Sequence, residues 1–396
     1  MRKITRYVLF ELVTVFAITL AAVTLLLIFA VLIKEGIREG LGFTAILKML
    51  PYVVPVAMQP ALPATILIAA CVVYGRMAAD NEIVAIKSLG ISPFAVIAPG
   101  LTLGFLVSIV AVWMNDLAPS WGRMGIYRVA IDSAEETVYR LLRTQRYIAT
   151  DFFSMNVKAV EGRRLIEPHI TVHGSGNSTE IYLHAREAIL ENDPENNVII
   201  IELRGGIADI GNDTTIDFRN ETYRQPIPLP SISRKGNNRD SPSLIPLRDI
   251  PSETITQRKI LADAEQMAAT QAAYQLMVGD FAGLGTPEWT HRMQLIQGHR
   301  TRLHRLNFEP YRRWAFGFSC FFFVLVGAPL AIQMKTRNFF TTFAACFFPI
   351  LLAYYPLLAF AVDRAKDGAV PPVTVWLGNL VMTVGGALIL RRVLRY

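Results

Sequence analysis

Six long apolar segments, three in the first 114 residues and three in the last 83, constrain the fold of this 396-residue chain more than any other feature. Each reaches the length of about 20 residues with which an α-helix crosses the hydrocarbon core of a bilayer. They are residues 8–33, 50–74, 94–114, 314–334, 339–362 and 370–390, and Glu11 is the only charged residue inside them. We predict an α-helical polytopic membrane protein with six transmembrane helices, an architecture more typical of a transporter than of a soluble enzyme.

The composition agrees with a membrane protein and excludes other classes. Hydrophobic residues make up 52% of the chain and charged residues 18%. The first apolar segment is too long for a signal peptide and lacks a small-residue cleavage site, so we expect it to be retained. The net charge of +7 comes largely from short loops, without a basic stripe, so we predict no nucleic-acid partner. Cys71, Cys320 and Cys346 fall in spans, where we interpret them as small buried apolar residues.

Lys and Arg in the short loops predict the orientation of the chain, because these residues are retained on the cytoplasmic side. If both termini are inside, ten of them lie in short cytoplasmic segments and five in short loops on the opposite side. The ten are Arg2, Lys3, Arg6, Arg76, Lys87, Lys335, Arg337, Arg391, Arg392 and Arg395, and the five are Lys34, Arg38, Lys48, Arg364 and Lys366. We therefore predict cytoplasmic N and C termini and a central domain outside the cytoplasm.

Between the third and fourth spans the sequence changes to a pattern of β-strands. The apolar residues Ile166, Pro168, Ile170 and Val172 alternate with polar ones, and residues 181–186 repeat this alternation. Turn-forming residues at 174–177, 192–197 and 211–213 leave room for roughly seven or eight short strands between residues 146 and 228. We predict an inserted extracytoplasmic β-jelly-roll or sandwich domain.

The chain returns to the membrane through a linker and two helices. Residues 230–251, rich in Ser, Pro, Asn and Arg, predict an exposed linker. Residues 253–278 and 287–308 predict two polar helices around a turn, and we expect this pair to form stalks that connect the β domain to the membrane. The predicted domains are 1–118, with three transmembrane helices; 119–311, with the β domain and its stalks; and 312–396, with the last three transmembrane helices.

The sequence contains no motif of a nucleotide-dependent or metal-dependent enzyme. The P-loop pattern Gly-x4-Gly-Lys-Ser/Thr is absent, and so are His-Glu-x-x-His, Cys-x-x-Cys and Gly-x-Ser-x-Gly. If transport uses ATP, another subunit must hydrolyse it. We predict a non-catalytic chain with no cofactor and no metal.

The connection between the second and third spans, near residues 76–91, carries the sharpest local signal. Asp80 can cap a short helix, Gly90 can end it, and Pro93 can open the next span. On this helix Ile83, Val84 and Ile86 would form an apolar face.

The charged residues of this connection leave two interpretations open. Asp80, Glu82 and Lys87 remain available to water or to a partner, and Arg76 precedes them. The helix either lies solvated on the membrane surface or docks as a coupling helix in a groove of a cytoplasmic ATPase. The residues alone favour the first interpretation, because surface charges are usually only solvated.

Lys34 and Arg38 lie one helical turn apart at the outer end of the first span. Cations at this depth commonly extend to the membrane interface without a further role. Alternatively, the two residues contact phosphate or another acidic group of an amphiphilic lipid. Glu35 and Glu39 alternate with them and could neutralise them.

Prolines and glycines interrupt two of the spans. They allow either a kinked gate or simple variation in packing, since freed backbone groups can be satisfied by neighbouring helices or a cavity. The residues are Pro51, Pro55, Pro60 and Pro63 in the second span, and Gly327 and Pro329 in the fourth.

Two stretches of the chain and the order of its segments carry a resemblance to a known family. The first is Leu-Pro-Ala-Thr at 62–65, followed by Gly-Arg-Met-Ala-Ala-Asp-Asn-Glu-Ile-Val-Ala-Ile-Lys-Ser-Leu-Gly-Ile-Ser at 75–92. The second is Leu-His-Arg at 303–305, then Pro310 and Gly-Ala-Pro-Leu-Ala-Ile at 327–332. Together with the order of three spans, a β domain and three spans, these stretches resemble the LptF/LptG family of lipopolysaccharide-export permeases, and the resemblance covers nearly the whole chain.

The resemblance implies an inner-membrane heterodimer of two such permeases with a cytoplasmic ABC ATPase. Such a complex extracts lipopolysaccharide and passes it through the β-jelly-roll domains to a periplasmic bridge protein of jelly-roll type. Glu82 would then be the coupling carboxylate that pairs with a basic residue of the ATPase, so the resemblance favours the coupling interpretation. Lys34 is similar to the family's basic residue that faces the acidic groups of the lipid.

Two features depart from the family pattern, and a rival function stays open. Phe308 and Glu309 precede Pro310, where we expect a more apolar approach, and the linker at 230–251 is longer than expected. The rival is a membrane-anchored receptor or scaffold whose β domain binds a periplasmic protein, although six spans exceed what an anchor needs. An ion-coupled transporter would need ionisable groups at membrane depth, and only Glu11 lies within a span.

Overall fold

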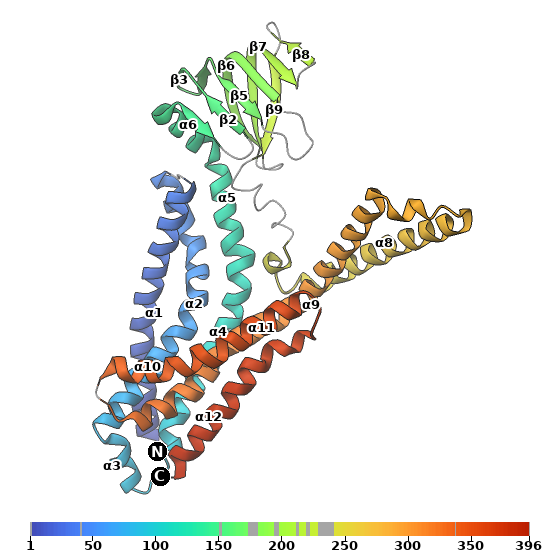
Figure 1. Ribbon diagram of the computed structural model, residues 1–396. Coiled ribbons are helices and arrows are strands. Elements are labelled where there is room, and N and C mark those ends of the chain that lie inside the picture. The colour runs from blue at the N-terminus through green and yellow to red at the C-terminus, as the bar shows by residue number, and fades with distance from the viewer. Residues whose placement is uncertain are drawn as a thin grey trace. The chain divides into compact units, whose positions relative to one another are not determined.

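The chain folds into two compact units (Figure 1). The computed structural model describes residues 2–39, 42–149, 153–172, 181–193, 198–210, 214–218, 222–228, 241–336 and 338–395. The helical unit comprises Met1–Ile28, Val54–Trp121 and Pro242–Tyr396, and the sheet unit comprises Phe29–Val53 and Gly122–Ser241. Each unit is described by itself below.

The six predicted spans are confirmed, because the described chain contains six helical segments long and apolar enough to cross a membrane. They are α1 (Arg2–Glu39), α2 (Phe43–Ala79), α4 (Phe94–Leu117), α9 (Pro287–Met334), α10 (Phe339–Pro349) continued by η5 (Ile350–Tyr354) and α11 (Tyr355–Lys366), and η6 (Pro372–Trp376) with α12 (Leu377–Arg395). Both termini lie at the same end of the helical unit (Figure 1), as an even number of spans requires.

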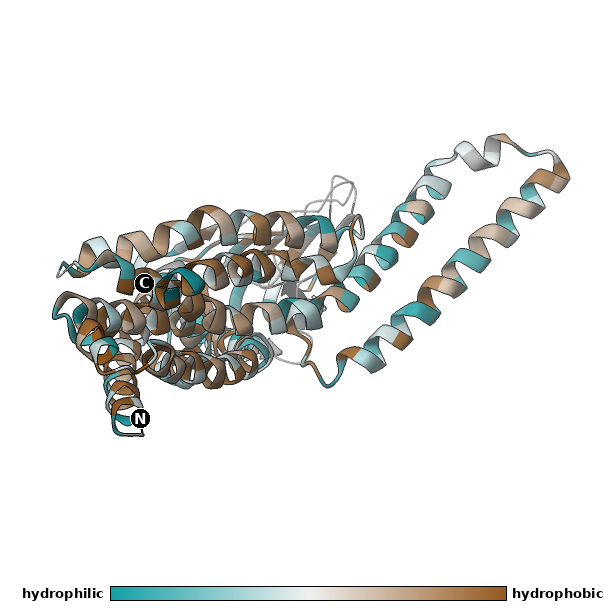
Figure 2. Cartoon of the chain, turned by 90° about the horizontal axis from the view of Figure 1, so that it is seen from below, coloured by the Kyte–Doolittle hydropathy of each residue, from teal (hydrophilic) through white to brown (hydrophobic). Residues whose placement is uncertain are grey.

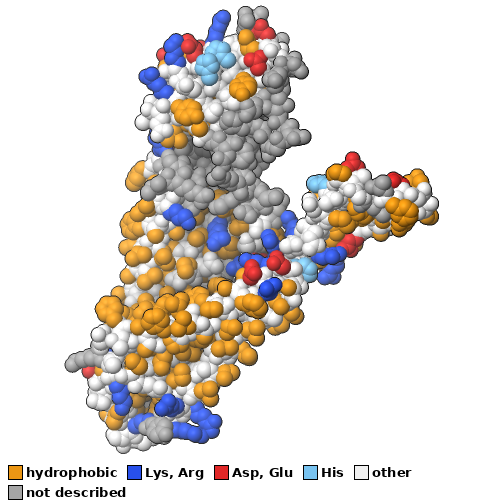
Figure 3. Space-filling model, viewed as in Figure 1, with side chains coloured by type: hydrophobic (Ala, Val, Ile, Leu, Met, Phe, Trp, Pro, Cys, Tyr) orange, Lys and Arg blue, Asp and Glu red, His pale blue; other side chains and the backbone are white. Residues whose placement is uncertain are grey.

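The helical unit has an apolar body whose core lies around α4 and α9. Apolar side chains cover its broad middle, and Lys and Arg gather at the end that holds the termini (Figure 3). Gly104 lets α4 approach Val324 of α9, and Gly317 of α9 faces Val112 in the same way. Helix α1 is much less covered by the rest of the protein, since only 11% of the residues in its apolar stretch are buried, against 67% in α9.

The prolines in the second and fourth spans do not break either helix. Helix α2 continues through all four of its prolines, and α9 continues through Pro310 and Pro329. At Gly327 an added Cβ would lie 2.6 Å from the Leu67 side chain. Gly327 therefore serves close packing between α2 and α9. Cys71, Cys320 and Cys346 are buried and free, as predicted.

After α4 the chain continues through η1 (Ala118–Arg123), α5 (Met124–Asp132) and α6 (Ala134–Gln145) into nine described strands. Helix α6 covers the sheet through Tyr139, whose hydroxyl donates to the Arg163 carbonyl at 2.7 Å and accepts from the Leu190 N–H at 2.8 Å. The strands are β1 (Tyr147–Ala149), β2 (Phe153–Asn156), β3 (Ala159–Glu161), β4 (Arg164–Ile166), β5 (His169–Val172), β6 (Ile181–Asp193), β7 (Val198–Ile210), β8 (Thr214–Asp217) and β9 (Thr222–Pro228).

The described strands form a single curled antiparallel sheet rather than two stacked sheets (Figure 1). The long strands β6 and β7 pair in the centre, β4 and β5 pair with β6, and β8 and β9 pair with β7. In β6 the alternating residues Leu183 and Ala185 are buried, and further along the strand the alternation shifts by one position, so that Ala188 and Leu190 are buried. The shift lies opposite Gly205 of β7, which has a φ of 67°. The β prediction is thus confirmed as an antiparallel sheet, and the jelly roll is not.

One predicted strand is wrong in its extent. Ile166 ends β4 and residues 169–172 form β5. The chain breaks between them because Glu167 has a φ of 48° and Pro168 has no N–H to donate to a ladder. The turns predicted at 174–177 and 211–213, and residues 194–197 of the third, lie outside the described residues.

The two polar helices predicted before the fourth span are confirmed as a hairpin. Helix α8 (Ile250–Val278) leads through η4 (Ala282–Gly285) into α9, which runs without a break into the membrane. A thin core of Leu261, Ala268 and Ile296 joins the two helices, and ion pairs of 2.7 to 2.8 Å flank it. In Figure 2 the hairpin alternates between hydrophilic and hydrophobic residues, as expected for helices outside a bilayer.

The linker at 230–251, predicted to be exposed, is buried or half-buried at residues 242–247 and exposed at Arg248 and Asp249. Residues 230–240 lie outside the described chain, but the next residues form η3 (Pro242–Leu244), in which Pro242 and Leu244 are buried. The carbonyl groups of Ser243 and Ile245 accept hydrogen bonds from an arginine of α9, which holds this segment against that helix.

Candidate functional site around helix α3

The connection between α2 and α4 folds as the short helix α3 (Glu82–Ser88). Its N-cap position is held by Asn81, with a φ of 59°, rather than by Asp80, and the Asn81 side chain makes no capping hydrogen bond. The predicted end at Gly90 is confirmed. The Gly90 N–H donates to the Lys87 carbonyl at 2.9 Å, and the Ile91 N–H donates to the Ile86 carbonyl at 3.3 Å, as in a Schellman motif.

One face of α3 packs on the core and another stays exposed. Ile83 is buried and Ile86 is half-buried against the apolar core. Val84, which we expected on the same face, is 50% exposed, because consecutive residues in a helix point about 100° apart. Leu89 is 74% exposed. We call the exposed residues Asp80, Val84 and Leu89, with the half-exposed Glu82, the α3 surface.

Arg76, at the end of α2, makes its contacts with another helix of the same chain. Its guanidinium makes an ion pair with Glu11 of α1 and donates to the Tyr7 hydroxyl at 3.3 Å. The Glu11 side chain is only 15% exposed, and its Oε2 has no hydrogen-bond partner among the residues that the structure describes. The pairing explains why one carboxylate is found inside an apolar span, since a charge there needs a partner. Glu11 was the sequence signal that could have revealed this contact.

Lys87, at the opposite end of α3, also contacts another helix of the same chain. Its ammonium group donates to the main-chain carbonyl of Val393 at 3.3 Å. Val393 lies in the last turn of α12, where helix carbonyl groups lack partners within the helix. The four residues predicted for coupling thus lie on one segment but differ in role. Arg76 joins this segment to α1 and Lys87 joins it to α12. Asp80 and Glu82 face outward.

Lys34 and Arg38 lie in the part of α1 that belongs to the sheet unit. Lys34 is exposed, and the side chain of Arg38 lies outside what the structure describes. Among the described residues, no three His, Cys, Asp or Glu side chains gather to hold a metal ion.

A comparison with protein families decides the class of the chain. Residues 6–392 match the family described as Lipopolysaccharide export system permease LptF/LptG. The chain belongs to the LptF/LptG family. The match includes α3 and all six spans, so this LptF/LptG chain is a multi-pass membrane permease of the lipopolysaccharide-export type, a transporter subunit. No curated protein matches the chain.

Proposed function

We propose that this LptF/LptG chain extracts lipopolysaccharide, or a similar amphiphilic lipid, from the inner membrane with energy from a separate cytoplasmic ABC ATPase. The α3 surface is the observation that carries the proposal. It combines the carboxylates Asp80 and Glu82 with the exposed apolar side chains of Val84 and Leu89. An amphipathic helix of this kind suits a groove with an apolar floor and a basic residue.

The anchoring of α3 supports a role in transmitting movement. Ile83 fixes it to the core, Lys87 connects it to α12, and Arg76 connects the preceding turn to α1. A displacement of α3 by an ATPase would therefore reach several spans at once. In this proposal Glu82 pairs with a basic residue of the ATPase, Asp80 assists it, and Arg76 and Lys87 hold the helix from within.

We propose that the two termini are cytoplasmic and that the sheet is periplasmic. Both termini lie at one end of the helical unit, where exposed Arg391, Arg392 and Arg395 gather. The positive-inside rule then makes this end cytoplasmic and the sheet periplasmic. We propose the domains 1–118, 119–311 and 312–396, with the hairpin as part of the periplasmic region.

In this proposal a second LptF/LptG-like permease pairs with this chain, and the spans of the two subunits enclose a cavity for the lipid. Helix α1 supports it, because Phe10, Leu26 and Phe29 are 58% to 73% exposed and offer apolar surface to a neighbouring helix or to lipid. Lys34 and Arg38 would contact the acidic groups of the lipid. The strands β1 and β3, each paired on one side only among the described strands, could extend into a jelly-roll bridge protein.

Affinity purification from the native membrane in mild detergent tests the proposal. The wild type should co-purify with an ATPase, and Glu82→Arg should lose it, because the reversed charge repels the basic partner. Glu288→Arg, the same change at an exposed position of α9, should keep it and serves as the control. If the wild type retains no ATPase, the receptor or scaffold function takes the place of the permease function.

A further inference from the structure

A buried arginine joins the two features by which this chain departs from the family pattern. Arg313 of α9 has a side chain that is 0% exposed, and the side chain of Glu309, one turn earlier, is 6% exposed. Burying a guanidinium is strongly unfavourable unless carboxylates and hydrogen-bond acceptors surround it. The partners of Arg313 therefore indicate which segments this buried charge connects.

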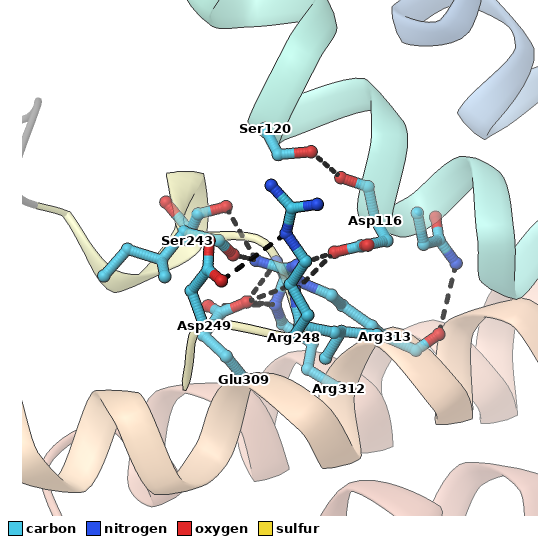
Figure 4. A network of polar contacts seen from close by, with 11 residues as sticks. Asp116, Ser120, Ser243, Arg248, Asp249, Glu309, Arg312 and Arg313 are labelled. Carbon is cyan, nitrogen blue, oxygen red and sulfur yellow. Dashed lines mark hydrogen bonds and ion pairs between the residues drawn. The ribbon is translucent and has the colours of Figure 1, made fainter. Parts of the chain in front are cut away.

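Arg313 binds one carboxylate from another helix and two carbonyl groups from the linker (Figure 4). Its Nη1 makes an ion pair with Asp116 near the end of α4, and its Nε lies 3.5 Å from Glu309 Oε2. Its Nη2 donates to the carbonyl groups of Ser243 at 3.1 Å and Ile245 at 2.7 Å. A guanidinium suits this task because its donors form a rigid planar fork.

Asp116 binds the same linker from the side of α4. Its Oδ1 accepts the N–H of Leu247 at 2.8 Å in addition to Nη1 of Arg313. The Asn115 side chain also donates to the Arg313 carbonyl at 3.3 Å. After Leu117, the last residue of α4, the helix widens into the π-helix η1, a rare form that often marks functional positions. We call Asp116, Glu309, Arg313 and residues 243–247 the junction.

The order of the chain makes the junction more than a local contact. Helix α4 is the path by which the chain leaves the helical unit, and residues 241–249 are the path by which it returns. Both paths are bound to α9 through Arg313 and Asp116. Helix α9 itself is one unbroken helix of 48 residues, so its membrane part and the junction belong to one rigid rod.

The packing of α4 and α9 prevents the two helices from separating easily at the junction. Gly317 is so close to α4 that an added Cβ would lie 2.7 Å from the Val112 nitrogen. The Phe321 N–H donates to the Ser108 hydroxyl at 3.0 Å. A movement of α9 must therefore carry α4 and the returning segment with it.

We propose that Arg313 is a positioning residue for lipid transport. Through Asp116 and the linker carbonyl groups it binds the outgoing and returning connections of the sheet unit to the fourth span. A movement of that span then reaches both connections together. The inference rests on the proposed permease function. It explains why Glu309 is found where an apolar residue was expected and why the linker is held rather than exposed.

Coupled lipid release is the first test. The full chain is purified with its co-purifying ATPase, reconstituted in vesicles that contain lipopolysaccharide, and tested for ATP hydrolysis and for release of lipopolysaccharide to a soluble acceptor. Arg313→Lys keeps the charge without the fork, and Asp116→Asn keeps the shape without the charge. We expect hydrolysis within about twofold of wild type and lipid release lower by at least about tenfold in both variants.

The control is Arg312→Gln, the neighbouring arginine, which binds Glu309 at 2.7 Å but has no contact with residues 243–247 among its hydrogen bonds and ion pairs in the described chain. It should leave release within about twofold of wild type. A purely structural junction would lower hydrolysis and release together. That result, or unchanged release in both junction variants, overturns the proposal.

A distance measurement tests the junction even if the permease function fails. Spin labels replace Trp113 of α4 and Arg248 of the returning segment, which are 60% and 85% exposed. The three native cysteines are buried and stay unlabelled. In the otherwise wild-type protein we expect a narrow distribution of distances between the two labels, unchanged by ATP. In Asp116→Asn we expect a broader distribution. An equally narrow distribution in that variant contradicts the junction. If instead the wild-type protein releases no lipopolysaccharide, only the permease function is contradicted.

Discussion

The ammonium group of Lys87 on α3 donates a hydrogen bond to the carbonyl oxygen of Val393, 306 positions later in the chain. The carbonyl groups in the last turn of a helix lack internal partners and carry the negative end of the helix dipole. A cation at this place therefore stabilises α12, and it fixes the position of α3 at the same time. The α3 surface is thus placed by the last helix of the chain as well as by α2 and α4.

Replacing Lys87 by Met should lower the free energy of unfolding by about 1 kcal/mol, because a hydrogen bond from a charged donor is lost. Thermal unfolding in detergent measures this change. Lys87→Arg keeps a cationic donor of similar length and should lose less. An equal loss in both variants would show that the hydrogen bond to Val393 is unimportant.

The Glu11–Arg76 pair should respond asymmetrically to substitution. Arg76→Gln leaves the carboxylate of Glu11 poorly exposed and without its ion-pair partner, and should cost about 1–3 kcal/mol of stability. Glu11→Gln leaves the half-exposed Arg76 to be solvated and should cost less than about 1 kcal/mol. Unfolding of both single variants and of the double variant checks the order. A larger loss in Glu11→Gln would contradict the assignment of Glu11 as the buried partner.

The spans and the hairpin were predictable because their signals are local. An apolar run of about 20 residues has essentially one stable solution in a bilayer, and the turn between α8 and α9 is marked by glycines. The end of α3 at Gly90 was equally predictable, since only glycine adopts a φ of 74° at little cost.

The contacts that hold the candidate sites were not predictable, because they join distant parts of the chain. Arg313 and Asp116 are 197 positions apart, and nothing near either residue indicates the other. Period two predicted strands in the sheet, but whether the sheet closes depends on strand pairings that no local pattern determines. The exposure of Val84 was predictable, since consecutive residues of a helix point about 100° apart and Val84 directly follows the buried Ile83.

Glu202 should make the stability of the sheet depend on pH. Hydrogen bonds from Arg204 and Arg224 lower the pKa of the Glu202 carboxyl below its usual value. Its contribution is therefore present above the pKa of the unfolded chain, about 4.3, and is lost as the pH falls through the lower folded pKa. The difference in thermal unfolding between wild type and Glu202→Gln should shrink below about pH 4.3. In an Arg204→Gln/Arg224→Gln background this pH dependence should disappear, and its persistence would point to another group.

Two glycines of α9 should respond to alanine in opposite directions. At Gly317 a Cβ would lie 2.7 Å from the Val112 nitrogen and 2.8 Å from its Cα, and backbone atoms cannot move away without separating α4 from α9. Gly317→Ala should therefore lower the free energy of unfolding by about 1–3 kcal/mol. At Gly298, in the hairpin, nothing lies within 4 Å of the added Cβ, so Gly298→Ala should raise it by about 0.5–1 kcal/mol through helix propensity. Thermal unfolding of the full chain in detergent compares the two, and a stable Gly317→Ala protein would mean that α4 and α9 do not pack this closely.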